Sequence, residues 1–152
     1  MVKTILGALL GAILFASHGA AADPADAARE VYRQFAAAQN ARDLEQVRTL
    51  LLNSPTFLWV SDGKSIWGRD AVLRRMALFQ EARVWRVDPD LDRSVAVPVG
   101  ADAAFLHLPL QLNLAFTSAE PEQLHFLVSV LCVETAQGWR IAALFTTTEN
   151  DR

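Results

Sequence analysis

The amino-acid sequence predicts an α+β fold in which three N-terminal helices pack on a curved, mostly antiparallel sheet. Apolar residues first recur at helical spacing, and from about residue 83 they alternate with a period of two. The alternating segments follow one another and are joined by short polar turns, as in neighbouring antiparallel strands. A run of helices followed by a run of strands is the layout of an α+β protein.

Three segments carry the signals of helix ends. Asp23 and Pro24 fit the N-cap and first position of a helix, and the apolar stripe that follows fades near Asn40. Asp43 fits the N-cap of a second, short helix. A third helix opens at Gly68.

The remaining segments are predicted strands. Asp62-Gly63 closes the first of them, and residues 136–138 form a tight hairpin turn. A longer turn covers residues 117–122. The predicted strands are 56–62, 65–67, 83–87, 94–99, 103–116, 123–135 and 139–148.

Residues 1–22 have the pattern of a cleavable signal peptide. Lys3 makes the start positive, residues 5–15 form an apolar run, and small residues follow up to Ala22. The apolar run is shorter than the roughly 20 residues of a membrane-spanning helix. We therefore expect secretion across the inner membrane, a periplasmic mature protein, and no stable membrane insertion after cleavage. Residues 23–152 are long enough for a single domain.

Composition excludes several classes of function. The chain carries a net charge of -3 with scattered arginines, so it lacks the basic face that nucleic acid requires. Cys132 is the one cysteine and cannot form an intramolecular disulfide. The sequence contains no HxH, HExxH or Cys/His cluster. We expect no metal site and no cofactor.

The predicted strand 103–116 has two distinct faces. Its even positions from 106 to 116 are five leucines and a phenylalanine, here called the leucine wall. The wall is expected to pack beneath the helices. Matching it to the apolar face of the next strand pairs Gln111 with Ser129, and Asn113 with Leu127, if the turn lies near residue 120.

The odd positions 105–115 form the mixed face, which combines apolar and polar residues. We expect Ile141 and Phe145 from the last strand to join it. A sheet that is apolar on both faces must cover both, so the mixed face is either a homodimer interface or the rim of a ligand site. In the second case Gln111, Asn113 and Ser129 would line the ligand pocket.

Three local patterns, taken in order, resemble a known superfamily. They are Phe35 followed by Asn40-Ala41-Arg42-Asp43-Leu44-Glu45-Gln46-Val47, then Ser61-Asp62-Gly63-Lys64 with Trp67-Gly68-Arg69-Asp70-Ala71-Val72, and finally Gly138-Trp139-Arg140-Ile141. This order resembles the nuclear transport factor 2-like superfamily, with its cystatin-like α+β cone. The sequence is most similar to the SnoaL-like and calcium/calmodulin-kinase-association-type domains, with residues 23–152 as one such domain.

The resemblance implies a cone-shaped pocket between helices and sheet, and often a homodimer through the sheet. It names no reaction, because members of this superfamily include isomerases, cyclases, dehydratases and epoxide hydrolases as well as proteins that only bind or assemble. Isomerase-like members place a tyrosine on the first helix and an aspartate beside the first strand. Tyr32 and Asp62 match those places in this sequence.

Tyr32, Asp62 and His107 are therefore the candidate catalytic residues. A buried tyrosine can donate a hydrogen bond to an enolate, and an aspartate in an apolar pocket can move protons. His107, inside a strand, can act as a general base near neutral pH. The structural alternatives are a packing position for Tyr32, an ordinary Asp-Gly turn for Asp62, and a polar sheet position for His107.

Aromatic and basic residues suggest the rest of a pocket. Trp59, Trp67 and Trp85 either line an apolar ligand cavity or fill the core. The arginines between residues 69 and 86 either form a solvated helix face or bind an anionic ligand or partner.

Three functions remain open at this point. The first is an exported domain that binds a small apolar ligand or partner in its pocket without catalysis. The second is a cofactor-independent isomerase, lyase or hydrolase that acts on a small apolar substrate. The third is a dimerisation or assembly module.

Overall fold

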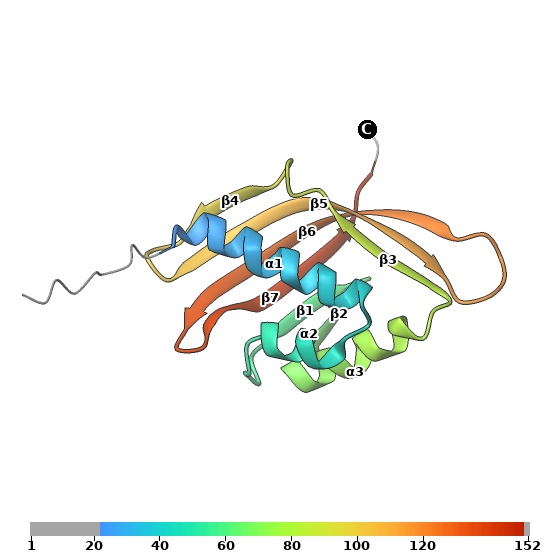
Figure 1. Cartoon of the computed structure of the whole chain (residues 1–152), viewed down its shortest axis with the longest axis horizontal. Coiled ribbons are helices and arrows are strands. Elements are labelled where there is room, and N and C mark those ends of the chain that lie inside the picture. The colour runs from blue at the N-terminus through green and yellow to red at the C-terminus, as the bar shows by residue number, and fades with distance from the viewer. Residues whose placement is uncertain (1–21, 151–152) are drawn as a thin grey trace, which may run out of the picture.

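The computed structural model describes residues 22–150. Within this range, the helices α1 (Pro24–Asn40), α2 (Leu44–Leu50) and α3 (Arg69–Gln80) lie on one side of a seven-stranded sheet (Figure 1). The predicted signal peptide lies, except for Ala22, outside the described residues. No helix of the described part is long and apolar enough to cross a membrane.

The sheet is curved and all but one of its strand pairings are antiparallel, which confirms the predicted α+β fold class. Its order is β2-β1-β7-β6-β5-β3, and β4 also pairs with β5. The exception is the parallel pair β1 and β7. The strands are β1 (Leu58–Ser61), β2 (Lys64–Trp67), β3 (Val84–Pro89), β4 (Val95–Pro98), β5 (Ala103–Ala115), β6 (Glu122–Thr135) and β7 (Gly138–Thr148).

Aspartates begin the first two helices, as the sequence predicts. The Asp23 carboxylate accepts a hydrogen bond from the Ala25 N–H at 2.8 Å, and the Asp43 carboxylate accepts one from the Gln46 N–H at 2.9 Å. Each satisfies an N–H group that has no partner within its helix. Residue 68 precedes α3 with a φ of 84°, a conformation that glycine adopts at little cost.

The C-terminal end of α1 is tied to the elements beside it. The Asn40 amide donates to the Val87 carbonyl at 2.8 Å and accepts from the Val87 N–H at 2.7 Å. The Arg42 guanidinium donates to the backbone carbonyls of Gln80 and Ala82. These bonds fix α1 against β3 and against the end of α3.

The core lies between α1 and the leucine wall. Leu106 and Leu108 are fully buried there, and Phe35 belongs to the same core cluster from the helix side. Cys132 belongs to this cluster, and burial raises the pKa of its thiol to about 12. The thiol is therefore protonated at neutral pH and behaves as a small apolar side chain.

The predicted register of the β5–β6 hairpin is wrong by four residues. Each β5 residue pairs with a β6 residue four positions nearer the turn than we predicted. A shift of four is even, so the leucine wall stays on the same face, and alternation alone cannot distinguish the two registers. The affected pairs are Gln111 with His125, in place of Ser129, and Asn113 with Gln123, in place of Leu127.

The turn itself explains the shift. Leu114 pairs with Glu122, so the connection is centred near residue 118 rather than 120. The Arg83 guanidinium donates to the carbonyls of Thr117 at 2.7 Å and Ala119 at 2.9 Å, which holds this loop in place. That contact comes from outside the hairpin and is not visible in the strand pattern.

A second prediction, the face on which Ile141 lies, is wrong because β7 contains a β-bulge. Ile141 pairs with Cys132 on the wall face and is fully buried, whereas we expected it on the mixed face. The pairing shifts between Leu131 and Cys132, where Ala142 is an extra residue of β7. One extra residue reverses the alternation on one side of the bulge, so Phe145 keeps its predicted face and Ile141 does not.

Replacing Leu106 with alanine should cost on the order of 3 kcal/mol of the free energy of unfolding, because it leaves a cavity in a fully buried site. Leu78→Ala is the matched control, since that side chain is 62% exposed on α3. Its effect should stay within about 0.5 kcal/mol. Urea unfolding followed by circular dichroism measures both, and equal losses would contradict this description of the core.

Candidate functional site

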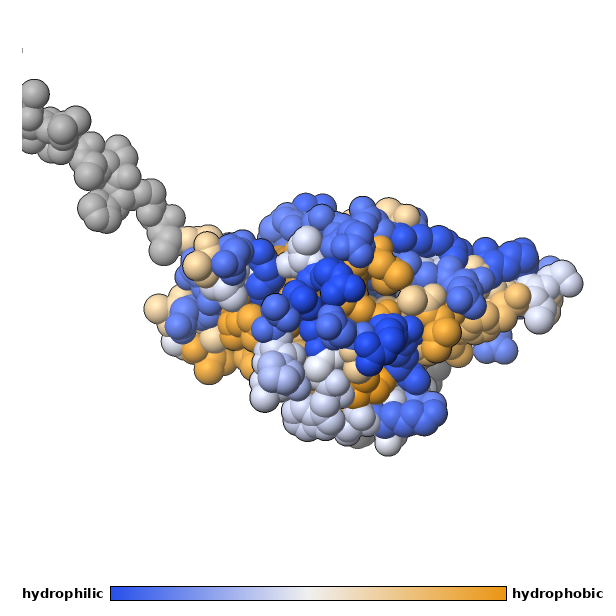
Figure 2. Space-filling model, turned by 90° about the horizontal axis from the view of Figure 1, so that it is seen from below, coloured by the Kyte–Doolittle hydropathy of each residue, from blue (hydrophilic) through white to orange (hydrophobic). Residues whose placement is uncertain are grey.

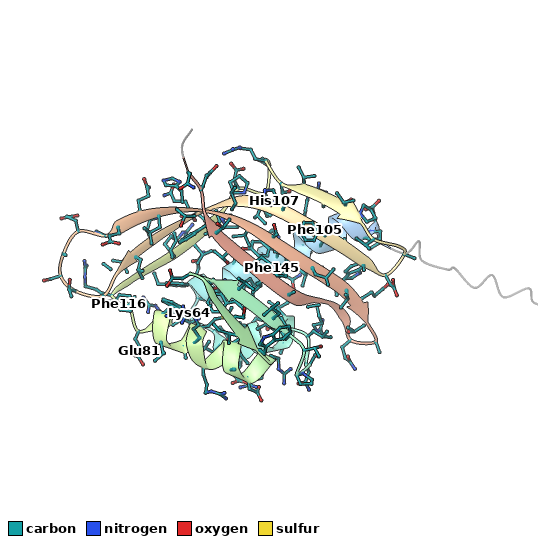
Figure 3. All side chains as sticks on the ribbon, turned by 180° about the vertical axis from the view of Figure 1, so that it is seen from behind. Lys64, Glu81, Phe105, His107, Phe116 and Phe145 are labelled. Carbon is teal, nitrogen blue, oxygen red and sulfur yellow. The ribbon has the colours of Figure 1, made fainter. Side chains whose placement is uncertain are left out.

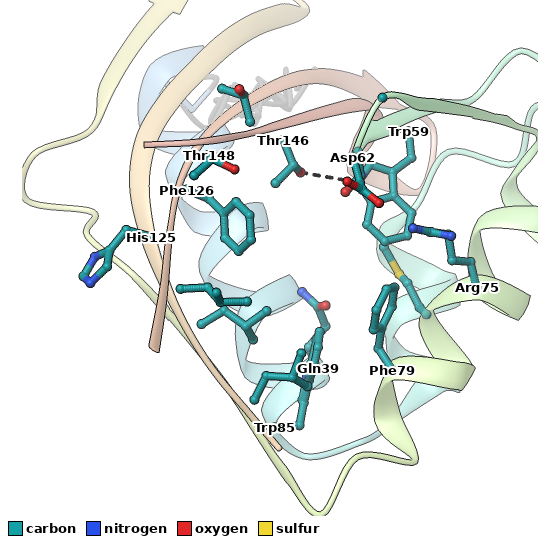
Figure 4. Close-up of a pocket in the computed structure, with 17 residues that line it drawn as sticks. Gln39, Trp59, Asp62, Arg75, Phe79, Trp85, His125, Phe126, Thr146 and Thr148 are labelled. Atoms are coloured by element: carbon teal, nitrogen blue, oxygen red, sulfur yellow. Dashed lines mark hydrogen bonds between the residues drawn. The ribbon is translucent and has the colours of Figure 1, made fainter. Parts of the chain in front are cut away.

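A cavity of about 600 Å³ opens between α3, the end of α1 and the sheet (Figure 4). It lies on the wall face, where the leucine wall continues past the end of α1. Small-molecule sites in proteins are typically 300–1,000 Å³ in volume, so this cavity has the size of a ligand site. Its apolar lining includes Trp59, Phe79, Trp85, Leu112, Leu114 and Phe126.

Three aromatic rings form one side of the cavity. The Phe79 ring stacks on Trp85 with centroids 5.8 Å apart and an interplanar angle of 22°. It meets Trp59 edge-on at 6.4 Å and 65°. The indole N–H of Trp59 donates to the Thr146 hydroxyl at 3.4 Å, which links the ring to β7 (Figure 4). The rings therefore hold one another in fixed orientations.

Arg75 extends along these rings from α3. Its guanidinium carbon lies 5.5 Å from the Trp59 ring centroid and 5.2 Å from that of Phe79, within cation–π distance. The side chain is half-buried, and its Nε atom is buried without a hydrogen-bond partner. The ion pairs found in residues 22–150 do not include it. Its positive charge therefore faces the cavity unneutralised.

Gln39 is a buried polar residue of α1 and is only 7% exposed. Its amide points into the cavity (Figure 4). It makes no side-chain hydrogen bond within residues 22–150, in contrast to the neighbouring Asn40 with its two bonds to Val87. Because the amide faces the cavity and bonds to no protein group, it is available to bond with a ligand or water.

Asp62 lies at the rim on the turn between β1 and β2. Asp62 and Gly63 have φ values of 53° and 67°, as both central residues of a type I′ hairpin turn require. The pairing of Ser61 with Lys64 on either side fixes a two-residue loop. The turn sequence thus determines where the carboxylate sits, and the side chain is solvent-exposed.

Tyr32 lines a smaller cavity of about 80 Å³ that adjoins the first and shares Gln39 and Trp59 with it. The tyrosine is 2% exposed. Burial, and to a smaller extent Cys132, raises the pKa of the Tyr32 phenol above its ordinary value. The hydroxyl is therefore a neutral donor at physiological pH and not a base.

The structure brings together only some of the predicted site residues. Trp59 and Asp62 line the main cavity, and Tyr32 lines the adjoining one. Trp67 is 58% exposed and does not line either cavity. The other four predicted residues, His107, Gln111, Asn113 and Ser129, lie on the mixed face, on the side of the sheet away from the cavity.

His107 therefore does not meet Asp62. Its Nδ1 atom lies 3.0 Å from the Ser129 hydroxyl, on the face of the sheet seen from behind (Figure 3). The other described histidine, His125, is at the cavity rim, but its ring points away from the cavity (Figure 4). In residues 22–150 there is no group of three or more His, Cys, Asp or Glu side chains that could hold a metal ion.

Sequence reasoning missed Gln39, and it considered Arg75 only as one of several arginines that could bind an anion; both residues left a signal. Gln39 continues the buried stripe of α1, seven residues after Tyr32 and four after Phe35, where an apolar residue is expected. Arg75 precedes Phe79 by four residues, so the two side chains share one helix face. Two patterns therefore indicate such residues. One is a polar residue within the apolar stripe of a helix, and the other is an arginine on the same helix face as an aromatic residue.

The fold is similar to that of several solved structures. A nuclear transport factor 2-like superfamily protein from Salmonella enterica serovar Typhimurium matches with a TM-score of 0.75 and 11% identity, over 83% of this chain and 91% of that one. An uncharacterized protein with a cystatin-like fold from Caulobacter vibrioides matches with a TM-score of 0.71 and 18% identity, over 84% and 90%. A protein with a cystatin-like fold from Novosphingobium aromaticivorans matches with a TM-score of 0.69 and 12% identity, over 85% and 84%.

These likenesses show that the protein has the same α+β fold as these structures, a curved sheet with helices on one side. The SnoaL-like domain family matches residues 28–144, so the chain belongs to the SnoaL-like family. None of the curated proteins matches it. The family establishes the fold, and the function has to be argued from the site.

Replacing Gln39 with leucine should raise the free energy of unfolding by about 1 kcal/mol, because it removes a buried amide that has no protein partner. Thermal and urea unfolding measure the change. Gln34→Leu, on the exposed side of the same helix, is the control and should give no gain. Asn40→Leu should be destabilising, since it breaks two bonds to Val87. A loss of stability in Gln39→Leu would show that the amide has a structural role.

Proposed function

We propose that this protein is an exported, non-catalytic domain that binds a small, largely apolar molecule in the 600 Å³ cavity. The observation that supports this most directly is the composition of the cavity wall. Aromatic and leucine side chains supply apolar area, and a few polar groups, including the Gln39 amide, lie among them without protein partners. An apolar cavity with a small number of convergent polar groups is the usual form of a small-molecule site.

Export is part of the proposal. The pattern of residues 1–22 supports a signal peptide, and α1 begins with the Asp23 N-cap directly after it, so cleavage would leave every described helix and strand intact. A periplasmic domain is separated from the cytosolic nucleotide pool. This fits a site that is built for an apolar molecule.

Catalysis is the second candidate, and what favours it is the position of Asp62 at the cavity rim. An isomerase, lyase or hydrolase would need further groups aimed at the same substrate atom. Tyr32 faces the adjoining small cavity and His107 lies on the opposite face of the sheet. The candidate residues do not converge as a set, which is why ligand binding is the better-supported function.

A neutral fluorescent probe, N-phenyl-1-naphthylamine, should bind the mature protein, and Leu114→Trp should weaken this binding at least about tenfold by filling the cavity. Fluorescence titration measures the affinity. The matched control is Leu78→Trp, the same substitution at an exposed position of α3. The protein should be recovered from the periplasm, where its intact mass also reports whether residues 1–22 were removed.

The outcomes separate the proposals. Failure of the probe to bind, together with native mass spectrometry showing no retained molecule, would refute the binding function. Binding that is unaffected by Leu114→Trp would place the probe elsewhere on the molecule. A ligand that is recovered chemically changed, and unchanged after Asp62→Ala, would favour the catalytic candidate.

We further propose that the mixed face joins two copies of this chain. In the described residues no helix covers this face (Figure 3). Two rows of paired residues cross five neighbouring strands on it. One row is Val97, Phe105, Leu131, Ala143 and Leu58, and the other is Val95, His107, Ser129, Phe145 and Val60.

Both rows are suited to burial. The polar members of the second row, His107 and Ser129, bond to each other at 3.0 Å, so a partner surface need not supply their bonds. Phe105 and Phe145 are each 38% exposed, although large apolar side chains are usually buried. At about 4.8 Å between strands the rows are roughly 19 Å long, and the same rows on a second copy could face them about a two-fold axis.

Phe105→Glu should convert the dimer to a monomer, because it places a charge within the proposed interface. Size-exclusion chromatography with light scattering measures the mass. Phe116→Glu is the matched control, since Phe116 is 56% exposed in the hairpin loop and away from both rows. A wild-type protein that remains monomeric at high concentration would rule out this interface.

A further inference from the structure

We propose that the molecule bound in the cavity is an organic acid, with an apolar body against the aromatic rings and a carboxylate bound by Arg75. This inference rests on the proposed ligand-binding function and specifies its chemical class. It starts from the one charged group of the cavity that is half-buried and has no anionic partner, Arg75.

The other arginines in residues 22–150 show how unusual Arg75 is. Six have a carboxylate partner and three donate to backbone carbonyls, which leaves Arg74 and Arg75. Arg74 is exposed, so water solvates its charge. Arg75 instead lies over Trp59 and Phe79, and its Nε–H is buried and unbonded. A partly desolvated cation with unused donors is a site for an anion.

The nearby carboxylate of Asp62 does not take this role. Two charged residues, Asp62 and Arg75, line the cavity, and the titratable His125 lines it as well. Asp62 and Arg75 form no ion pair with each other. Asp62 is held at the rim by its turn and is exposed to solvent, which screens its charge. Arg75 is therefore left to bind an incoming group rather than a residue of its own chain.

The geometry favours a planar acid over a point charge. A guanidinium presents parallel N–H groups that match the two oxygens of a carboxylate. The rings of Trp59 and Phe79 orient the Arg75 side chain, and together with Trp85 they offer flat apolar faces in the cavity. An aromatic or aliphatic body can pack on these faces while its carboxylate meets the guanidinium. The Gln39 amide carries no charge and does not by itself distinguish an acid from a neutral analogue.

A pair of probes that differ only in charge tests the inference. The mature wild-type protein should bind 2-naphthylacetate at least about tenfold more tightly than 2-naphthylacetamide, as expected for bonds to a charged group. This preference should shrink as ionic strength rises. Isothermal titration calorimetry measures both affinities.

Three variants test whether Arg75 is responsible for the preference for the acid over the amide. Arg75→Met keeps the apolar stem against the rings and removes the charge, so it should bind the acid and the amide equally. Arg74→Met is the matched control on the same helix and should keep the full preference. Arg75→Lys keeps the charge without the planar fork and should show an intermediate preference, and it replaces the methionine variant if that one fails to fold by circular dichroism.

The results separate this inference from the proposed function. Equal affinity of the wild type for the two probes, or a preference that survives in Arg75→Met, would overturn the assignment of an acid while leaving ligand binding in place. If the naphthyl probes and N-phenyl-1-naphthylamine all fail to bind, both the acid and the binding function are refuted. A preference that disappears in Arg75→Met and persists in Arg74→Met establishes the site.

Discussion

The structure depends on the burial of a leucine wall by a helix that is too short to cover it. Strand β5 has 13 residues and is about 43 Å long, whereas the 17 residues of α1 span about 25 Å. The helix is tied at both ends, by Arg29 to Ser94 and by Asn40 to Val87. Val87 lies opposite Leu112, so the wall beyond this point has no α1 above it. Other elements cover the remaining part of the leucine wall, and the space between them and the wall is a cavity instead of a packed core.

This mismatch of lengths explains why the same row of leucines has two roles. Leu106 and Leu108 are fully buried beneath α1, and Leu112 and Leu114 line the cavity. Helix α3 and the β1–β2 hairpin close the open end. Hydrophilic residues dominate the outer surface seen from the side of α3, with hydrophobic ones showing between them (Figure 2). The one row of leucines therefore contributes both to the stabilising core and to the wall of the cavity.

The polar groups of the cavity carry a cost to stability that the core does not. The Nε–H of Arg75 and the indole N–H of Trp85 are buried without a hydrogen-bond partner in residues 22–150, as are the Arg69 Nε and the Gln80 amide nitrogen outside the cavity lining. Unsatisfied polar groups are rare in protein interiors. Two of the four such atoms belong to residues that line the cavity, and a functional site is one place where such local rules are broken.

Much of the fold could be predicted because local physics decides it. Capping by Asp23 and Asp43, the Asp62-Gly63 turn and the alternation in β5 are each properties of a few consecutive residues, and the structure confirms them. The resemblance to the superfamily supplied the cone and the expectation of a pocket. Trp59 was predicted as an aromatic lining residue and Asp62 through the resemblance, and the structure places both at the cavity.

The sequence by itself thus determined which face of each strand is apolar and where most elements begin and end. Only the tertiary structure decided which of two equivalent registers the hairpin takes, since a shift of four residues leaves every side chain on its face. It also decided that the cavity lies on the wall face, away from Gln111 and Ser129, and that Arg75 turns inward while Arg74 stays in solvent. The physical reason is the same in each case. Contacts between segments far apart in the chain, such as Arg83 with the hairpin loop and Arg75 with Trp59, select among arrangements that local patterns leave equal in energy.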